Sequence, residues 1–231
     1  MWGRRNLRIS VDRIQLEVRP RTNDLDLVSP KHEPITTQWF QAAEKDVVID
    51  VGAHIGRYTL IAAERGAKVI AIEPDPSNFL VLEQNVRLNG FSNVVLVNEA
   101  MTSTPGLLVL SKAGLFNTGT SSVRAANANA PTTHQERSEV YVQGGTLDGI
   151  VQAYSLTRID WLKIDVEGHE IAVLEGALAA LSVTRSLILE VTESTKEACK
   201  RIVEENGFSL VAIEEGDPAT NWLLVNRTLS S

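Results

Sequence analysis

The sequence has very little cysteine and no long hydrophobic run. Its one cysteine, Cys199, excludes an intrachain disulfide and a zinc site made of several cysteines, and we interpret it as a small apolar residue on a helix. No apolar stretch approaches the ~20 residues that span a bilayer. The N-terminus carries two arginines without a following apolar segment, so we expect no secretory signal and a cytoplasmic location.

Clustered positive charge is lacking too. The 22 Lys and Arg residues are outnumbered by 29 Asp and Glu residues, which gives a net charge of −7, and the basic residues are scattered apart from the pair Arg4 and Arg5. Proteins that bind nucleic acid usually carry a basic stripe, so the composition argues against such a partner. The 231 residues, 43% of them hydrophobic, are enough for one main domain.

Strand-like runs alternate with segments of helical periodicity from about residue 45 onward. Buried strands are expected where apolar and β-branched residues run together, at 46–52, 68–74, 93–100, 161–166 and 186–193. Helices are expected between and after them, at 57–66, 76–90, 170–181 and 195–206. This alternation indicates an α/β fold with a parallel sheet covered on both faces. Two closely spaced strands, 208–215 and 221–226, predict a closing antiparallel hairpin.

Two regions depart from the alternation. Residues 1–44 predict at most short strands followed by a polar connection, and we treat them as an N-terminal extension to a domain that spans 45–231. Residues 111–138 form a long polar excursion. A structureless segment of that length in a compact domain is usually a lid, a binding loop or a disordered insert.

The segment VVIDVGAHIG carries the strongest local signal for a ligand site. In open α/β sheets, ligands bind at the carboxyl ends of the strands, where a glycine-rich turn enters a helix. Gly52 and Gly56 do not have the G-x-G-x-x-G spacing of nicotinamide sites, and Asp50 just before them would repel a pyrophosphate. A carboxylate there suits a ligand with an ammonium and a sulfonium group, which describes S-adenosylmethionine.

A second acid strengthens this interpretation. Glu73 follows the next strand, at the position from which a carboxylate accepts hydrogen bonds from ribose hydroxyls. Taken singly, Asp50 could instead cap a helix and Glu73 could be a solvated loop residue. The presence of both acids at these sequence distances from one glycine turn favours a binding site for S-adenosylmethionine.

Charge is concentrated in WLKIDVEGHE, at the end of the strand predicted over 161–166. Asp165 would lie at the mouth of the same pocket, with Glu167 and His169 just beyond it. A hydroxyl that accepts a methyl group must lose its proton, and a carboxylate or imidazole within hydrogen-bond reach can take it. These three residues are the candidate bases. Alternatively, Glu167 and Glu170 complement the dipole of the next helix, and His169 packs or faces water.

The same residues raise a metal hypothesis. Asp165, Glu167 and His169 offer oxygen and nitrogen ligands for Mg²⁺ or a transition metal, and Glu190 could complete either a metal shell or a base-orienting pair. The sequence has no second carboxylate cluster and no His-x-x-x-His pair to support such a site. We therefore predict no required metal.

Together, DVGAHIG at 50–56, AIEPDP and WLKIDVEGHE resemble the FkbM family of S-adenosylmethionine-dependent O-methyltransferases, over roughly residues 45–195. The family couples a DVGAxxG loop with a downstream K-x-D-x-E-G-x-E. The resemblance implies a Rossmann-like class I methyltransferase fold, with a seven-stranded, mostly parallel sheet whose last strand is antiparallel. It also implies the residues that bind the donor, with the last two flanking its adenine: Asp50, Gly52, Gly56, Glu73, Ala100 and Met101. His54 stands where the family more often has asparagine, and we interpret it as a neutral imidazole of the donor pocket, with a catalytic role as the alternative.

The acceptor follows only from the resemblance, which implies a hydroxyl of a sugar, a glycolipid or a glycosylated small molecule. Residues of the polar excursion resemble the family's acceptor-side loop and could bind hydroxyls, or form an ordinary turn: Asn117, Thr118, Ser121 and Ser122. An RNA methyltransferase is an alternative, because the region after AIEPDP also resembles tRNA-modifying enzymes, although the acidic balance opposes it. A non-catalytic module that binds the donor is another. Whether residues 1–44 cap the site, form a homodimer contact or are a partly mobile arm stays open.

Overall fold

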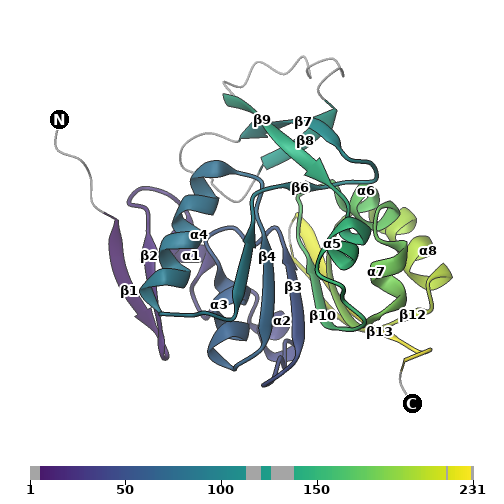
Figure 1. The fold of residues 1–231 in the computed structure, drawn as a ribbon, viewed down its shortest axis with the longest axis horizontal. Coiled ribbons are helices and arrows are strands. Elements are labelled where there is room, and N and C mark those ends of the chain that lie inside the picture. Colours follow the sequence, from purple (N-terminus) through teal and green to yellow (C-terminus); the bar gives the residue numbers. More distant parts are fainter. Residues whose placement is uncertain (1–5, 113–120, 126–137, 217, 230–231) are drawn as a thin grey trace.

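The computed structural model describes residues 6–112, 121–125, 138–216 and 218–229. Its main sheet has seven strands in the order β12-β13-β11-β10-β3-β4-β5 (Figure 1). Their bounds are β3 Val47–Val51, β4 Lys68–Ile72, β5 Val94–Val97, β10 Ile159–Ile164, β11 Thr184–Thr192, β12 Phe208–Glu214 and β13 Ala219–Asn226. Strands β3, β4, β5, β10 and β11 run parallel, while β13 is antiparallel to both β11 and β12. The predicted mostly parallel sheet with its C-terminal hairpin is confirmed.

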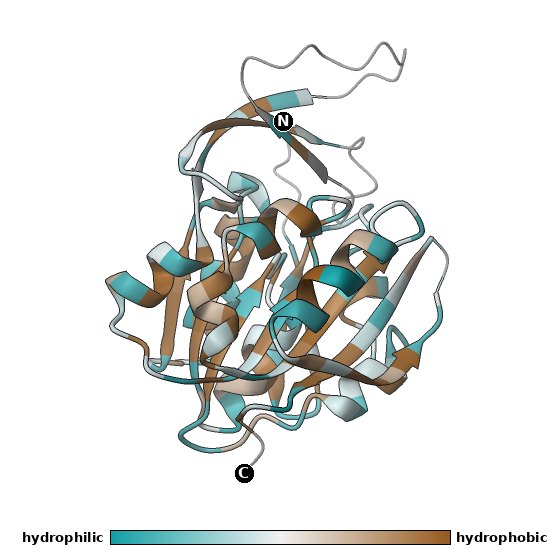
Figure 2. Ribbon diagram, turned by 90° about the vertical axis from the view of Figure 1, so that its right-hand side faces the viewer, coloured by the Kyte–Doolittle hydropathy of each residue, from teal (hydrophilic) through white to brown (hydrophobic). Residues whose placement is uncertain are grey.

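Helices cover both faces of this sheet. Helices α3 (Arg57–Glu64) and α4 (Pro76–Leu88) pack on one face, and α5 (Leu147–Ala153), α6 (Glu170–Glu175), α7 (Leu178–Ser182) and α8 (Lys196–Glu205) pack on the other. The strands between them are largely hydrophobic (Figure 2). Cys199 is fully buried within α8, which confirms its interpretation as a core residue. Among the described helices, none combines the length and apolar character needed to cross a membrane.

The single helix expected over 170–181 is wrong, because the structure divides it into α6 and α7 at Gly176. A Cβ added to Gly176 would lie 2.1 Å from the backbone oxygen of Thr102. Only glycine allows that close approach, and glycine is also a poor helix former. The close approach of Thr102 explains the residue type, and the low helix propensity of glycine agrees with the break at this position.

A second sheet lies above the first in Figure 1. It has the order β6-β9-β7-β8, built from β6 (Ala100–Met101), β7 (Gly106–Lys112), β8 (Ser121–Ala125) and β9 (Ser138–Gly145). The excursion over 111–138 is thus partly ordered as strands, contrary to the expectation of a loop. The predicted acceptor residues Asn117 and Thr118 fall outside the described residues, and Ser121 and Ser122 begin β8.

The N-terminal segment packs beside the first helical face. Its hairpin pairs β1 (Leu7–Val11) with β2 (Ile14–Val18), and short helices α1 (Asp24–Leu27) and α2 (Pro34–Trp39) follow. The Asn85 side chain of α4 accepts the backbone N–H of Glu17 at 2.6 Å, and Ile14, Leu16 and Val18 join the hydrophobic cluster under α3 and α4. Division of the chain at residue 44 stays a prediction.

Candidate active site

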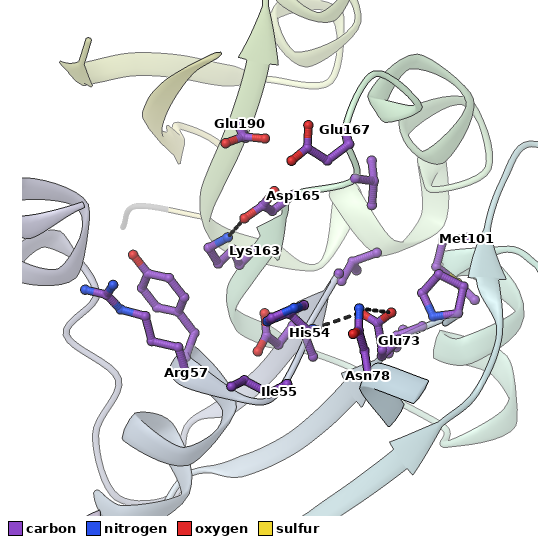
Figure 3. A pocket seen from close by; sticks show the side chains of 18 of the residues that line it. His54, Ile55, Arg57, Glu73, Asn78, Met101, Lys163, Asp165, Glu167 and Glu190 are labelled. Carbon is purple, nitrogen blue, oxygen red and sulfur yellow. Dashed lines mark hydrogen bonds and ion pairs between the residues drawn. The ribbon is translucent and has the colours of Figure 1, made fainter. Parts of the chain in front are cut away.

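A pocket opens at the carboxyl ends of β3, β4, β10 and β11 (Figure 3). Leu110 and Val123 of the second sheet form part of its wall, and so do Leu27, His32 and Glu33 of the N-terminal segment. Most of the site residues expected from the sequence line it: Asp50, Gly52, His54, Glu73, Ala100, Met101, Asp165, Glu167 and His169. Gly56 does not line the pocket. It begins α3 with a φ of 104°, and its lack of a side chain lets α3 approach Leu82 of α4.

Gly52 permits the close approach of two central strands. Its φ of +81° favours glycine, and a Cβ there would lie 1.8 Å from the backbone oxygen of Asp165. The N–H groups of Gly52 and Ala53 both donate to the backbone oxygen of Ile72 at the end of β4, at 2.9 and 3.0 Å. The turn therefore holds the ends of β3, β4 and β10 together at the floor of the pocket.

Glu73 is held in the pocket by the backbone around it. It is 5% exposed, and its carboxylate accepts the N–H groups of His54 at 2.8 Å and Asp75 at 2.9 Å. Burial raises its pKa to about 7, although these hydrogen bonds oppose the rise. The alternative that Glu73 is a solvated loop residue is wrong.

Asp50 is buried beneath the glycine turn. It accepts a hydrogen bond from the Thr59 hydroxyl at 2.6 Å, whereas the N-cap of α3 is Gly56, so the alternative of a helix cap at Asp50 is wrong. Burial raises the pKa of Asp50, opposed by the neighbouring ammonium of Lys163. A positively charged group entering the pocket would remove much of this penalty.

His54 faces the N-terminal segment. Its Nε2 lies 3.5 Å from the Arg19 guanidinium and 3.8 Å from an oxygen of the fully buried Asp24. Burial lowers the pKa of His54 to about 4, so the imidazole is neutral at pH 7. The imidazole ring contacts residues 19–24, and the backbone N–H of His54 donates to Glu73.

Lys163 and Asp165 form an ion pair with a Nζ to Oδ2 distance of 2.6 Å, in which Lys163 is buried and Asp165 is partly exposed (Figure 3). Burial alone would raise the pKa of Asp165, but the Lys163 ammonium and hydrogen bonds from Lys163 and Glu190 outweigh it and hold this pKa below its usual range. Burial and the charge of Asp165 raise the pKa of Glu190, so that carboxyl carries its proton at pH 7 and donates to Asp165. The adjacency of Glu190 and Asp165 expected from the sequence is confirmed.

Glu167 and His169 lie beyond this pair on the turn into α6. Glu167 has a left-handed backbone with a φ of 49°, and no described residue forms a hydrogen bond with its carboxyl group. Burial, then the charges of Asp165 and Glu170, raise its pKa to about 7. His169 has a pKa lowered by burial, and its buried Nε2 has no hydrogen-bond partner among the described residues. Glu170 instead accepts the Gly168 N–H at 2.6 Å and is not among the residues that line the pocket.

Three acids converge at this end of the pocket: Glu33, Asp165 and Glu190, each with an oxygen within 4.8 Å of the others. Among the described residues, this is the group whose geometry could hold a cation. The Lys163 ammonium already lies against it. The metal hypothesis from the sequence named a different set, Asp165, Glu167 and His169.

Sequence reasoning missed the roles of Lys163 and Glu33. A lysine inside the apolar run WLKIDV was a usable signal, because a buried charge needs charged partners. Glu33 gave no such signal, since only the tertiary fold brings the N-terminal segment to β10.

This fold and this pocket define a class I S-adenosylmethionine-dependent methyltransferase. The chain belongs to the FkbM methyltransferase family, whose Methyltransferase FkbM domain matches residues 50–213. The predicted family, fold and methyl donor are confirmed.

Two curated relatives are also methyltransferases. The hexuronic acid methyltransferase AglP of Haloferax volcanii is 30% identical over 154 residues, which are 65% of this chain and 58% of that protein. The chain thus spans less than two thirds of that relative. Methyltransferase 1 of Beauveria bassiana is 27% identical over 186 residues, which are 74% of each chain.

Solved structures share the fold. Precorrin-6y C5,15-methyltransferase from Geobacter metallireducens has a TM-score of 0.53 at 12% identity, covering 94% of this chain and 95% of that one. P. horikoshii TYW2 in complex with MeSAdo also has a TM-score of 0.53, at 18% identity, covering 95% and 69%. Identities this low support the fold and leave the acceptor open.

Proposed function

We propose that the protein transfers a methyl group from S-adenosylmethionine to a hydroxyl of a sugar, a glycolipid or a glycosylated small molecule. The observation that carries this proposal is Glu167, a pocket carboxyl whose pKa of about 7 suits removal of a hydroxyl proton near neutral pH. The hydroxyl acceptor also agrees with the FkbM resemblance.

The donor is assigned to the part of the pocket around β3 and β4. Glu73 and Asn78 present hydrogen-bonding groups for ribose hydroxyls, and Asp50 presents a buried acid for the ammonium group. Ala100 and Met101, with Leu110 and Val123 from the second sheet, supply an apolar wall for adenine. These groups fit the donor in charge and polarity.

The acceptor end lies around Asp165, Glu167 and Glu190, opposite Glu73 and Met101 in Figure 3. When bound, S-adenosylmethionine supplies a methyl group on a positively charged sulfur. Asp165 is a poor base, because Lys163 and Glu190 already bind it and its pKa is low. His169 has its Nε2 buried. Glu167 is left to accept the hydroxyl proton, while Asp165 and Lys163 fix the floor beneath it.

A sugar acceptor gains support from the family relative named a hexuronic acid methyltransferase. The acids of the pocket also oppose an RNA acceptor, whose phosphates would face Glu33, Asp165 and Glu167 without a free cation among the described lining residues.

Transfer of a ¹³C-labelled methyl group tests the proposal. The protein is incubated with ¹³C-methyl donor and a panel of glycosides, and the product is analysed by NMR. We expect the label on oxygen. Label on nitrogen or carbon, or transfer to RNA in place of the glycosides, would contradict the proposed function.

A further inference from the structure

The acceptor end of the pocket is rich in acid. Glu33, Asp165, Glu167 and Glu190 all line it. Burial and the charge of Asp165 raise the pKa of Glu190, so this carboxyl is protonated at pH 7. The pKa of Asp165 is held below its usual range, so Asp165 is charged, and Glu167, with a pKa of about 7, is partly charged. A group entering here meets several carboxyl oxygens within a few ångströms of one another.

The cationic side chains among the described lining residues already have hydrogen-bond partners. Lys163 donates to Asp165 at 2.6 Å and lies 4.7 Å from the centre of the Tyr58 ring. Arg57 donates to the backbone oxygen of Leu27 at 2.9 Å, to the Thr37 hydroxyl at 2.8 Å and to the backbone oxygen of His32. Arg57 therefore holds the N-terminal segment in place.

Imidazole does not supply the missing positive charge. His32, His54 and His169 line the pocket, and burial lowers the pKa of each, so all three are predominantly neutral at pH 7. Neutral imidazole can still exchange hydrogen bonds with hydroxyl groups. The lining thus offers acceptors and neutral donors, without a free cation among the described residues.

Glu33 has a strained backbone conformation, and hydrogen bonds hold its side chain in place. It has a left-handed backbone with a φ of 43°, which an L residue with a long side chain rarely adopts. Tyr58 Oη donates to one carboxylate oxygen at 2.8 Å, and the Asn221 amide donates to the other at 3.0 Å. Strain of this kind persists where surrounding contacts enforce it, and it concentrates at functional sites.

We propose that Glu33 makes this site selective for a hydroxylated acceptor that bears no acidic group beside the methylated hydroxyl. Neutral sugars and amino sugars fit, whereas uronic acids are rejected because their carboxylate would face Glu33, Asp165 and Glu167 without a counter-ion. This selectivity rests on the proposed O-methylation.

Matched acceptors that differ in one substituent test the selectivity. The methyl glycosides of glucosamine, glucose and glucuronic acid, and the corresponding galactose series, are assayed with tritium-labelled methyl donor at pH 7. We expect kcat/KM to be at least ~100-fold lower for each uronic acid than for its neutral partner, because like charges at a desolvated contact are strongly unfavourable. Added salt should narrow this ratio.

Glu33→Gln is the matched variant, since it removes the charge and keeps the size of the side chain. We expect the ratio of neutral to uronic acid turnover to fall ~10-fold, with S-adenosylhomocysteine binding retained. Glu44→Gln is the control, because Glu44 is exposed at the opposite end of β3. Thermal unfolding verifies that each variant is folded, and the wild-type ratio tests the proposal even if Glu33→Gln does not fold.

The results of these assays distinguish a failure of the proposed selectivity from a failure of the proposed function. Comparable turnover of uronic and neutral glycosides would overturn the selectivity and leave O-methylation standing. An unchanged ratio in folded Glu33→Gln would remove Glu33 from the proposal. Absence of transfer to every glycoside, by protein that binds S-adenosylhomocysteine, would overturn the sugar acceptor and the selectivity with it.

Discussion

Glu167→Gln is expected to lower kcat by about 10²–10⁴-fold, the usual contribution of a positioned general base. Glutamine keeps the shape of the side chain but cannot accept a proton from the acceptor hydroxyl. The donor is assigned to the other end of the pocket, so the affinity for S-adenosylhomocysteine should stay within about twofold. The measurement is kcat with the best acceptor of the glycoside panel, together with calorimetric titration.

The pH dependence gives a second readout for the same residue. Because burial raises the pKa of Glu167 to about 7, the base is protonated below that pH and ionised above it. The kcat/KM of the wild type should therefore rise with pH and level off above about 7, and the residual activity of Glu167→Gln should lose this step. Glu175→Gln is the control, since Glu175 is exposed at the end of α6. Full turnover by Glu167→Gln would exclude Glu167 as the base.

Lys163→Met is expected to lower the free energy of unfolding by about 3–5 kcal/mol at pH 7, the usual effect of removing one partner of a buried ion pair. Lys163 is 2% exposed, and burial alone would lower its pKa. The charges of Asp165 and Glu33 outweigh burial and keep it ionised. Methionine would fill the space beside Tyr58 but leave those carboxylates without their counter-ion. Urea denaturation monitored by circular dichroism measures the loss.

A double-mutant cycle separates charge from packing. Asp165→Asn removes the largely buried carboxylate that Lys163 neutralises, so the Lys163→Met, Asp165→Asn protein should be more stable than the sum of the two single losses predicts. Lowering the pH should also reduce the loss in Lys163→Met, because protonated carboxyls need no counter-ion. A loss below about 1 kcal/mol, or strict additivity, would contradict the role given to Lys163.

The framework of the site follows from local patterns in the sequence. Apolar strands that alternate with amphipathic helices specify the parallel sheet, and a glycine turn after the first of its strands specifies where a ligand binds. The acids Asp50 and Glu73 could be placed because the carboxyl ends of neighbouring parallel strands meet at one edge. The antiparallel closing strand followed from the short connection between the last two strands.

The features that the sequence did not predict depend on contacts between segments that are distant in the chain. Glu33 reaches Asp165 only because the N-terminal segment packs on α3, where Arg57 binds its backbone. The need for glycine at position 176 depends on the close approach of Thr102, a contact that no periodicity in the sequence reveals. Whether Asp165 or Glu167 is the better base also depends on the fold. Lys163 and Glu190 lie against Asp165 and lower its pKa, whereas the pKa of Glu167 stays raised.

Calorimetric titration with S-adenosylhomocysteine tests the central claim, that the glycine turn and its acids hold the methyl donor. Wild type, Asp50→Asn and the control Glu44→Gln are compared. One S-adenosylhomocysteine molecule should bind per chain in the wild type and the control. Asp50→Asn should bind it about 10–100-fold more weakly, because a charged hydrogen bond of about 1.5–3 kcal/mol is lost. Equal affinity in folded Asp50→Asn, or no binding by folded wild type, would contradict the account.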